Sequence, residues 1–358
     1  MKFKISDKTV FAWHSWLGLI VGLFSLFLSI TGILLLFSDE IDAALSPELL
    51  NVQPAPKRFP ADSMLSTLQH TYPQAVLIET HLNTSHPGRA VVTELILDGE
   101  SQLVYWNPYT NQLNGLRKKE DVWKNSILEW HEELTAGDVG HVFLFIVGLA
   151  LLGSVLTGVW YYRKSLLKVF TVGVRRKNTY LFNADLHKLT GVISCLFLVL
   201  MAGTGTFFHW EKIERMMGEE GEQPREVKAD FSAPVLSKVK FSLDGLLRDA
   251  AQNVPDFLPE HIQYPRTEAS VVVSGTHSKS IRLLGEFNTR VVFDTGSSQF
   301  KEVIHQEDGD MEQMMEKSFE QLHYGQYGGL WSKIIYALGG LCLSALSLTG
   351  FVIWLKKK

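Results

Sequence analysis

The sequence predicts a membrane α-helical protein: a four-helix transmembrane bundle from an internal duplication, with two small α+β periplasmic domains. Three observations predict this class. Charge-free apolar stretches have the length of membrane spans, basic segments alternate with long polar segments, and the apolar stretches repeat with constant spacing. The 358-residue chain is 46% hydrophobic and 20% charged, which excludes both a disordered protein and one that lies entirely within the membrane.

Four stretches contain no Asp, Glu, Lys or Arg, and they are 28, 24, 22 and 22 residues long. They cover residues 10–37, 139–162, 189–210 and 334–355. About 20 apolar residues cross the hydrocarbon core of a bilayer as a helix, so each stretch is long enough to span it. The first is too long for the apolar region of a cleaved signal peptide, and we interpret it as a retained span.

Basic residues predict the orientation. They occur before the first span, between spans two and three, and after span four, so these three segments face the cytoplasm. The two long segments then face the periplasm of a bacterium, and the protein is expected in the inner membrane with both termini inside. The basic residues are Lys2, Lys4, Lys8, Arg163, Lys164, Lys168, Arg175, Arg176, Lys177, Lys356, Lys357 and Lys358. The predicted order is head and span one at 1–37, periplasmic domain 38–130, span two at 131–163, link 164–180, span three at 181–210, periplasmic domain 211–322, and span four with the tail at 323–358.

Each periplasmic segment shows the pattern of a small α+β domain. In the first, spacing predicts a helix at 61–72 and strands at 75–79, 90–97 and 102–106, with Asp98-Gly99 as a hairpin turn. In the second, it predicts a helix at 243–252 and strands at 269–274, 280–284 and 290–294.

The spans repeat with histidines in register. His14 and His187 each precede a glycine by 4 residues and a Thr-Gly pair by 17. His131 and His323 are each followed at offsets of 6, 17 and 26 by glycine, glycine and Thr-Gly. The chain therefore contains two copies of span, domain and span, and each copy contributes two histidines at matching positions.

Histidines within spans are costly and are functional candidates. Symmetry places His14 opposite His187 near the cytoplasmic end, and His131 opposite His323 just outside the periplasmic ends. Two facing imidazoles form a bis-histidine b-type haem site, so these four are the expected axial ligands of two haems. The alternative is that they anchor the helices at the membrane interface. No catalytic residue is assigned.

Two further histidines, His141 and His209, share a depth and form a reserve pair for the outer haem or for an additional one. The alternative is that they are polar residues at the membrane interface. His131 lies 29 residues from Trp160, which is level with His187, and a straight helix would separate them by about 43 Å. The four Thr-Gly pairs are interpreted as helix packing contacts. The histidines of the long segments show no ligand spacing and are interpreted as surface residues: His70, His81, His86, His261, His277 and His305.

Several classes of site are excluded. A net charge of −4 gives no indication of nucleic-acid binding. Cys195 and Cys342 both lie within spans, so no structural disulfide or covalent haem-attachment motif is expected. No Gly-x-Gly-x-x-Gly motif occurs, so the chain has no nicotinamide or flavin site of its own, and its haems would take electrons from a membrane quinol or a separate cytoplasmic reductase.

The chain resembles the PepSY-associated transmembrane proteins over nearly its whole length. The matching motifs surround His14, His131, His187 and His323, and residues 104–115 are similar to the PepSY turn with Asn111 in place of glycine. The resemblance implies an inner-membrane dihaem protein with PepSY-like periplasmic domains that reduces ferric siderophores to release Fe(II). It implies two haem b groups, a ferric siderophore as substrate, and a role in iron acquisition.

Two other functions remain open. A non-redox membrane regulator would use its PepSY domains to bind a periplasmic protein partner, and its histidines would be structural. A metal transporter is disfavoured because the spans contain no acidic residue to neutralise a cation.

Overall fold

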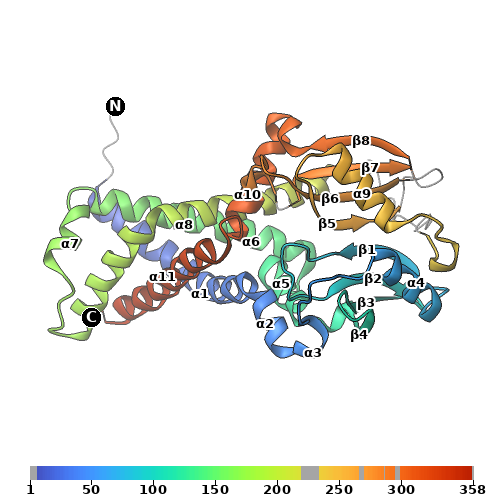
Figure 1. Cartoon of the computed structure of the whole chain (residues 1–358). Coiled ribbons are helices and arrows are strands. Elements are labelled where there is room, and N and C mark those ends of the chain that lie inside the picture. Colours follow the sequence, from blue (N-terminus) through green and yellow to red (C-terminus); the bar gives the residue numbers. More distant parts are fainter. Residues whose placement is uncertain (1–5, 219–233, 266–269, 286, 295–298, 357–358) are drawn as a thin grey trace. The chain divides into compact units, whose positions relative to one another are not determined.

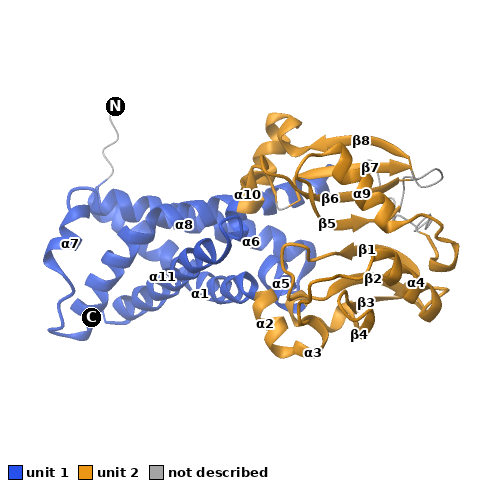
Figure 2. Cartoon of the chain, in the orientation of Figure 1, with its two compact units in different colours: residues 1–37, 126–221, 322–358 blue, residues 38–125, 222–321 orange. Residues whose placement is uncertain are grey.

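The computed structural model describes residues 6–218, 234–265, 270–285, 287–294 and 299–356. The chain divides into two compact units, coloured separately in Figure 2. The first comprises residues 1–37, 126–221 and 322–358, and the second comprises residues 38–125 and 222–321. Lys2, Lys4, Lys357 and Lys358, which were used to predict the orientation, lie outside the described residues.

Long helices form the first unit (Figure 1). They are α1 (Asp7–Leu36), α6 (Gly137–Tyr162), α8 (Thr179–Gly218) and α11 (Gly329–Leu355). Within the described residues these four are long and apolar enough to cross a membrane. Both α1 and α8 contact α6 and α11, so α1 and α8 are diagonal neighbours in the bundle. The link between α6 and α8 contains η2 (Leu166–Lys168) and α7 (Val169–Val172).

Small polar side chains lie inside the bundle, and large apolar side chains lie on its outer surface. Ser29, Ser154 and Thr206 are buried between helices, whereas Leu23 and Leu196 are 70% and 83% exposed. Ser29 Oγ lies 2.7 Å from Ser344 Oγ on α11, which ties α1 to α11. Small hydroxyl residues allow helix backbones to approach closely when the surrounding solvent is lipid, so this distribution suits a membrane bundle.

Two of the spans are preceded by a separate short helix. These helices are α5 (Trp123–Glu133) and α10 (Met311–Tyr324). Leu134 and Thr135 have φ of 53° and 59° after α5, and Gly325 has φ of 66° after α10. Such left-handed residues end a helix, so His131 and His323 lie on short helices that change direction before α6 and α11.

The second unit is built on an antiparallel sheet. Its order is β4-β3-β2-β1-β5-β6-β7-β8, with one half from each long segment. The strands are β1 (Val76–His81), β2 (Val91–Leu97), β3 (Glu100–Asn107), β4 (Gln112–Lys118), β5 (Leu258–Gln263), β6 (Ser270–Thr276), β7 (Thr289–Asp294) and β8 (Phe300–His305). The sequence predicts two small domains, but β1 and β5 pair and join the halves into a single unit. Pairing removes the unpaired edge that each half would otherwise expose.

Two helices cover one face of this sheet, α4 (Ala61–Thr71) and α9 (Leu243–Asn253). The core beneath them contains Met64, Leu68, Leu246, Ile262 and Phe293. A smaller cluster is formed by Val52, Ala90 and Tyr105 with the leucines of α3. The remaining short elements are α2 (Ser38–Leu45), α3 (Pro47–Leu50), η1 (Lys119–Asp121), η3 (Leu236–Lys238), η4 (Arg282–Leu284) and η5 (Gln306–Asp308).

Most local predictions for this unit are confirmed. The helices α4 and α9 form where spacing predicts them, and Asp98 and Gly99 form the hairpin turn with φ of 52° and 83°. Asn111 has φ of 58°, a conformation that asparagine tolerates, so it replaces glycine in its turn without much strain. The strand predicted at 280–284 is wrong, because Arg282–Leu284 form a 3₁₀ turn that ends at Gly285 with φ of 122°.

Candidate functional site

The bundle brings His14 and His187 together. They lie on the diagonal helices α1 and α8, and their ring centres are 6.1 Å apart. Nδ1 of His14 contacts the carbonyl oxygen of Ser154 at 2.9 Å. Nδ1 of His187 contacts Thr349 Oγ1 at 3.0 Å. We call these two residues the inner pair.

His131 and His323 form an outer pair of the same kind. Their ring centres are 6.4 Å apart. Nδ1 of His131 lies 2.8 Å from Thr31 Oγ1, and Nδ1 of His323 lies 2.8 Å from Thr204 Oγ1. The sequence predicts that these histidines lie just outside the spans, but each is turned against a residue within a membrane-length helix.

These contacts decide which ring nitrogen carries the proton. The Ser154 carbonyl can only accept, so His14 Nδ1 donates. Thr349 Oγ1 gives its proton to the carbonyl of Ala345 at 2.6 Å, and Thr204 Oγ1 gives its proton to that of Leu200 at 2.8 Å. Thr31 Oγ1 likewise contacts the carbonyl of Phe27 at 3.1 Å. When its proton lies on that carbonyl, each threonine oxygen accepts from Nδ1–H, and Nε2 of every paired histidine keeps its lone pair.

Each histidine ring also rests on a glycine. A Cβ atom at Gly158 would lie 2.9 Å from His14 Cε1, and one at Gly32 would lie 3.3 Å from His131 Cε1. Gly205 and Gly350 hold the same relation to His323 and His187, at 3.3 and 3.4 Å. The Thr-Gly pairs were interpreted as plain helix packing. That interpretation is incomplete, because each glycine leaves space for a histidine ring of a different helix.

The inner and outer pairs lie at different depths in the bundle. His14 and Thr31, which contacts His131, are 17 residues apart on α1. At 1.5 Å per residue these levels are about 25 Å apart along the helix. The expected separation of about 43 Å is wrong because His131 lies on α5, so counting along a single straight helix does not apply.

The donor set of both pairs fits a metal held between two histidines. Metal–nitrogen bonds in histidine sites are about 2.0–2.1 Å long, so a metal ion centred between two imidazoles separates their ring centres by roughly 6 Å. The observed 6.1 and 6.4 Å agree with this value. The unprotonated Nε2 atoms are the ligand form of histidine, and the Nδ1 contacts are the outer-sphere partners that orient such ligands. The residues present therefore fit a bis-histidine haem at each level.

The reserve pair has a different geometry. Nδ1 of His141 lies 3.2 Å from Nδ1 of His209, and His141 Nε2 lies 3.4 Å from a Glu133 carboxylate oxygen. Two nitrogens on opposite sides of a metal ion would be about 4 Å apart. An iron ion does not fit between these Nδ1 atoms, and His141 Nε2 faces a carboxylate instead of a second imidazole, so the geometry favours His131 and His323 at the outer level.

Two groups of histidines outside the bundle were missed. His261 is buried, and it lies with Glu79 and His81. His277 and His305 lie with Glu307. The surface assignment of His261 is therefore wrong. Alternation could not have indicated it, because Glu260, His261 and Ile262 are buried in succession on β5.

Comparison with known protein families gives a match over most of the chain. A comparison with curated proteins found no match. The family model of the PepSY-associated TM region matches residues 11–357, which is nearly the whole chain. The chain therefore belongs to the PepSY-associated transmembrane family.

Proposed function

We propose that this protein is an inner-membrane dihaem b-type oxidoreductase that passes electrons to ferric siderophores in the periplasm and releases Fe(II). The inner pair would hold one haem and the outer pair the other. A bis-histidine haem, when bound, takes up and gives up single electrons without an open coordination position. One electron for each ferric ion balances the reaction.

The observation that carries the proposal is the pair of opposed histidine rings at each level, with every Nδ1 against an oxygen of a neighbouring helix. Each has Nδ1–H occupied by an acceptor from a neighbouring helix, so each presents Nε2 as a neutral donor. Histidines that served only to anchor helices at the membrane surface would not require this arrangement twice at opposed positions. The repeated spacing of the two pairs supports an internal duplication.

Contacts with neighbouring helices and an aromatic ring keep the paired rings in place. His14 and His187 are held by backbone and hydroxyl oxygens of α6 and α11, and Phe208 packs at 5.4 Å against the ring of His323. Rigid orientation of both ligands is what a one-electron carrier needs, because the ligand set then stays unchanged as the charge on iron changes.

A hollow near the level of His14 supports a quinol as the electron donor. Its volume is about 480 Å³, within the range of small-molecule sites. Its lining residues are Lys8, Phe11, Ala12, Ser15, Trp16 and Trp354. Ser15 follows His14 directly on α1, so an aromatic headgroup bound here would lie next to the inner level.

The test uses purified protein reduced anaerobically and freed of excess reductant. On addition of a ferric siderophore, the reduced haem absorption bands should decay, and an Fe(II)-specific chelator should capture about one Fe(II) for each electron lost. The gallium(III) form of the same siderophore is the control, since gallium is not reduced under these conditions. Bands that persist with the whole siderophore panel, or that decay equally with gallium, would contradict the proposal.

A further inference from the structure

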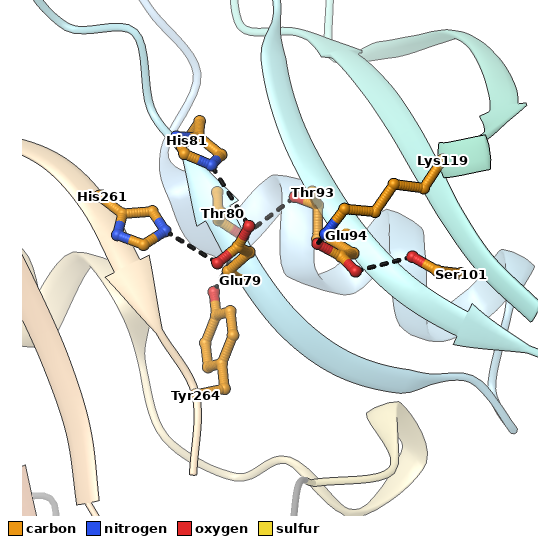
Figure 3. Close-up of polar contacts among 9 residues, drawn as sticks. All are labelled: Glu79, Thr80, His81, Thr93, Glu94, Ser101, Lys119, His261 and Tyr264. Carbon is orange, nitrogen blue, oxygen red and sulfur yellow. Dashed lines mark hydrogen bonds and ion pairs between the residues drawn. The ribbon is translucent and has the colours of Figure 1, made fainter. Parts of the chain in front are cut away.

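The seam between β1 and β5 gathers three side chains that neither the bundle nor the proposed electron path uses. In the antiparallel register His81 lies opposite His261, and Glu79 lies two residues before His81 on the same strand. Directly opposed residues have Cβ atoms about 4.5–5.5 Å apart, and residues i and i+2 share a face. Glu79, His81 and His261 therefore lie on one face of the sheet (Figure 3). We call them the seam triad.

Irregular pairing in both strands aims this triad away from the helices. The register shifts between Leu77 and Glu79 on β1 and between Pro259 and His261 on β5. Such a bulge changes the face on which the following side chains lie. As a result Thr80 points toward the core, where it contacts Thr93 Oγ1 at 3.0 Å, and its neighbours Glu79 and His81 point to the opposite face.

The triad presents converging donor atoms. The two oxygens of Glu79 lie 3.5 Å from His81 Nε2 and 3.3 Å from His261 Nε2. The ligand atoms of all three residues lie within 4.8 Å of one another.

Within the seam triad, His261 has a buried nitrogen that lacks a hydrogen-bond partner. Its side chain is only 9% exposed, and its Nε2 is buried without a hydrogen bond, because the contact with Glu79 is poorly aligned. A buried polar nitrogen without a full partner costs about 1–3 kcal/mol. Phe287 stacks on the ring at 5.8 Å and His81 at 4.4 Å, so the nitrogen cannot turn freely to water.

We propose that Glu79, His81 and His261 bind one divalent first-row transition-metal ion. Two imidazole nitrogens and one carboxylate suit zinc, ferrous iron and similar ions, and they disfavour the all-oxygen ions calcium and magnesium. Three protein ligands leave a coordination position for water on the side of His81, whose side chain is 43% exposed. The ion would join one long segment to the other, since its ligands come from both strands of the seam.

Zinc binding to the full-length protein tests this proposal. Protein washed with a chelator is titrated with Zn²⁺, and bound metal is counted after dialysis. The wild type should retain one tightly bound Zn²⁺ per chain. His261→Ala, His81→Ala and Glu79→Gln should each lower the affinity for this ion by more than the ~10–100-fold typical of an outer-sphere partner. Unchanged affinity in these three variants would overturn the proposal.

Two control variants locate the ion. His70→Ala removes an exposed histidine, and His277→Ala disrupts the second group, in which Nδ1 of His277 and of His305 already contact Ser280 and Thr289. Both variants should keep the bound Zn²⁺ that His261→Ala loses. Loss of the bound Zn²⁺ in His277→Ala, with His261→Ala unaffected, would place the ion at the second group and refute the seam site.

A measurement on the wild-type protein tests the same site without depending on whether the variants fold. Diethyl pyrocarbonate modifies accessible, unliganded imidazoles, and peptide mass spectrometry reads the extent at each one. Zn²⁺ should protect His81 several-fold and leave the exposed His70 unprotected. Equal modification of His81 with and without Zn²⁺ would contradict the proposal whatever the variants do.

Discussion

Oxygen atoms of neighbouring helices control the chemistry of the four paired histidines. Three are threonine hydroxyls, and one is the Ser154 carbonyl, which takes this role for His14 although Thr157 lies nearby. Thr157 Oγ1 instead donates to the carbonyl oxygens of Gly153 and Ser154. The two threonines of the inner level, Thr349 and Thr157, are therefore similar in position but different in function.

Replacing Thr349 with valine should weaken haem binding at the inner level. The change removes the hydroxyl acceptor of the Nδ1–H of His187, and loss of such an outer-sphere partner typically lowers metal affinity about 10–100-fold. Thr157→Val is the matched control and should have little effect, because His14 uses the Ser154 carbonyl. Haem retained per protein after dilution measures both, and equal losses in the two variants would show that the hydroxyl does not act through His187.

Gly158→Ala should displace His14 and lower haem content toward one equivalent per protein. The new Cβ would lie 2.9 Å from Cε1 and 3.1 Å from Nδ1 of the ring, closer than side chains pack. Gly22→Ala on α1 is the control, since its Cβ would meet nothing within 4 Å. Alanine is also the better helix former by about 1 kcal/mol, so the control should keep its haem and its stability.

At the scale of elements, α4 and α9 cap each other. Asp244 accepts from the backbone N–H groups of Ala61 and Asp62 at 3.0 Å each. Asp62 accepts from the N–H of Leu243 at 2.6 Å and from Ser242 Oγ at 2.6 Å. One aspartate from each long segment thus satisfies the helix start of the other, which couples the two halves of the sheet.

Asp62→Ala should destabilise the sheet unit. Loss of a helix N-cap costs about 1–2 kcal/mol, which lowers the melting temperature of a unit of this size by roughly 2–8 °C. The double variant with Asp244→Ala should lose less than the sum, because the two residues share one network. Ser66→Ala, whose hydroxyl makes an exposed contact with Asp62 O, is the control and should melt like the wild type. Strict additivity in a calorimetric scan would contradict reciprocal capping.

At the scale of the whole molecule, charge and spacing predicted the spans and the histidine pairs. Four charge-free stretches matched four helices, and equal offsets correctly placed His14 opposite His187 and His131 opposite His323. The role of Thr31 and Gly32 could not be predicted, because spacing within one helix does not say which side chain of another it meets. The joining of β1 to β5 was missed because strand β5 contains Pro259, Glu260 and His261, which mask its alternation.

The orientation of the bundle is a prediction that fusions can test. Alkaline phosphatase fused after Arg117 or Ser237 should be active, since both residues lie in the long segments assigned to the periplasm. A fusion after Lys168, within the basic link between α6 and α8, should be inactive. An active alkaline phosphatase fused after Lys168 would show that the orientation is the reverse of the predicted one, with the outer pair on the cytoplasmic side.

The haem content of single histidine variants tests the central claim most directly. Pyridine haemochrome on purified protein should give two haem b per chain for the wild type, and about one for His14→Ala, His187→Ala, His131→Ala or His323→Ala. The double variant of either pair should lose no more than its single variants. His141→Ala and His209→Ala should keep two, because their Nδ1 atoms contact each other at 3.2 Å. A colourless wild-type protein, or haem lost from His141→Ala and His209→Ala but kept in His131→Ala and His323→Ala, would contradict the account.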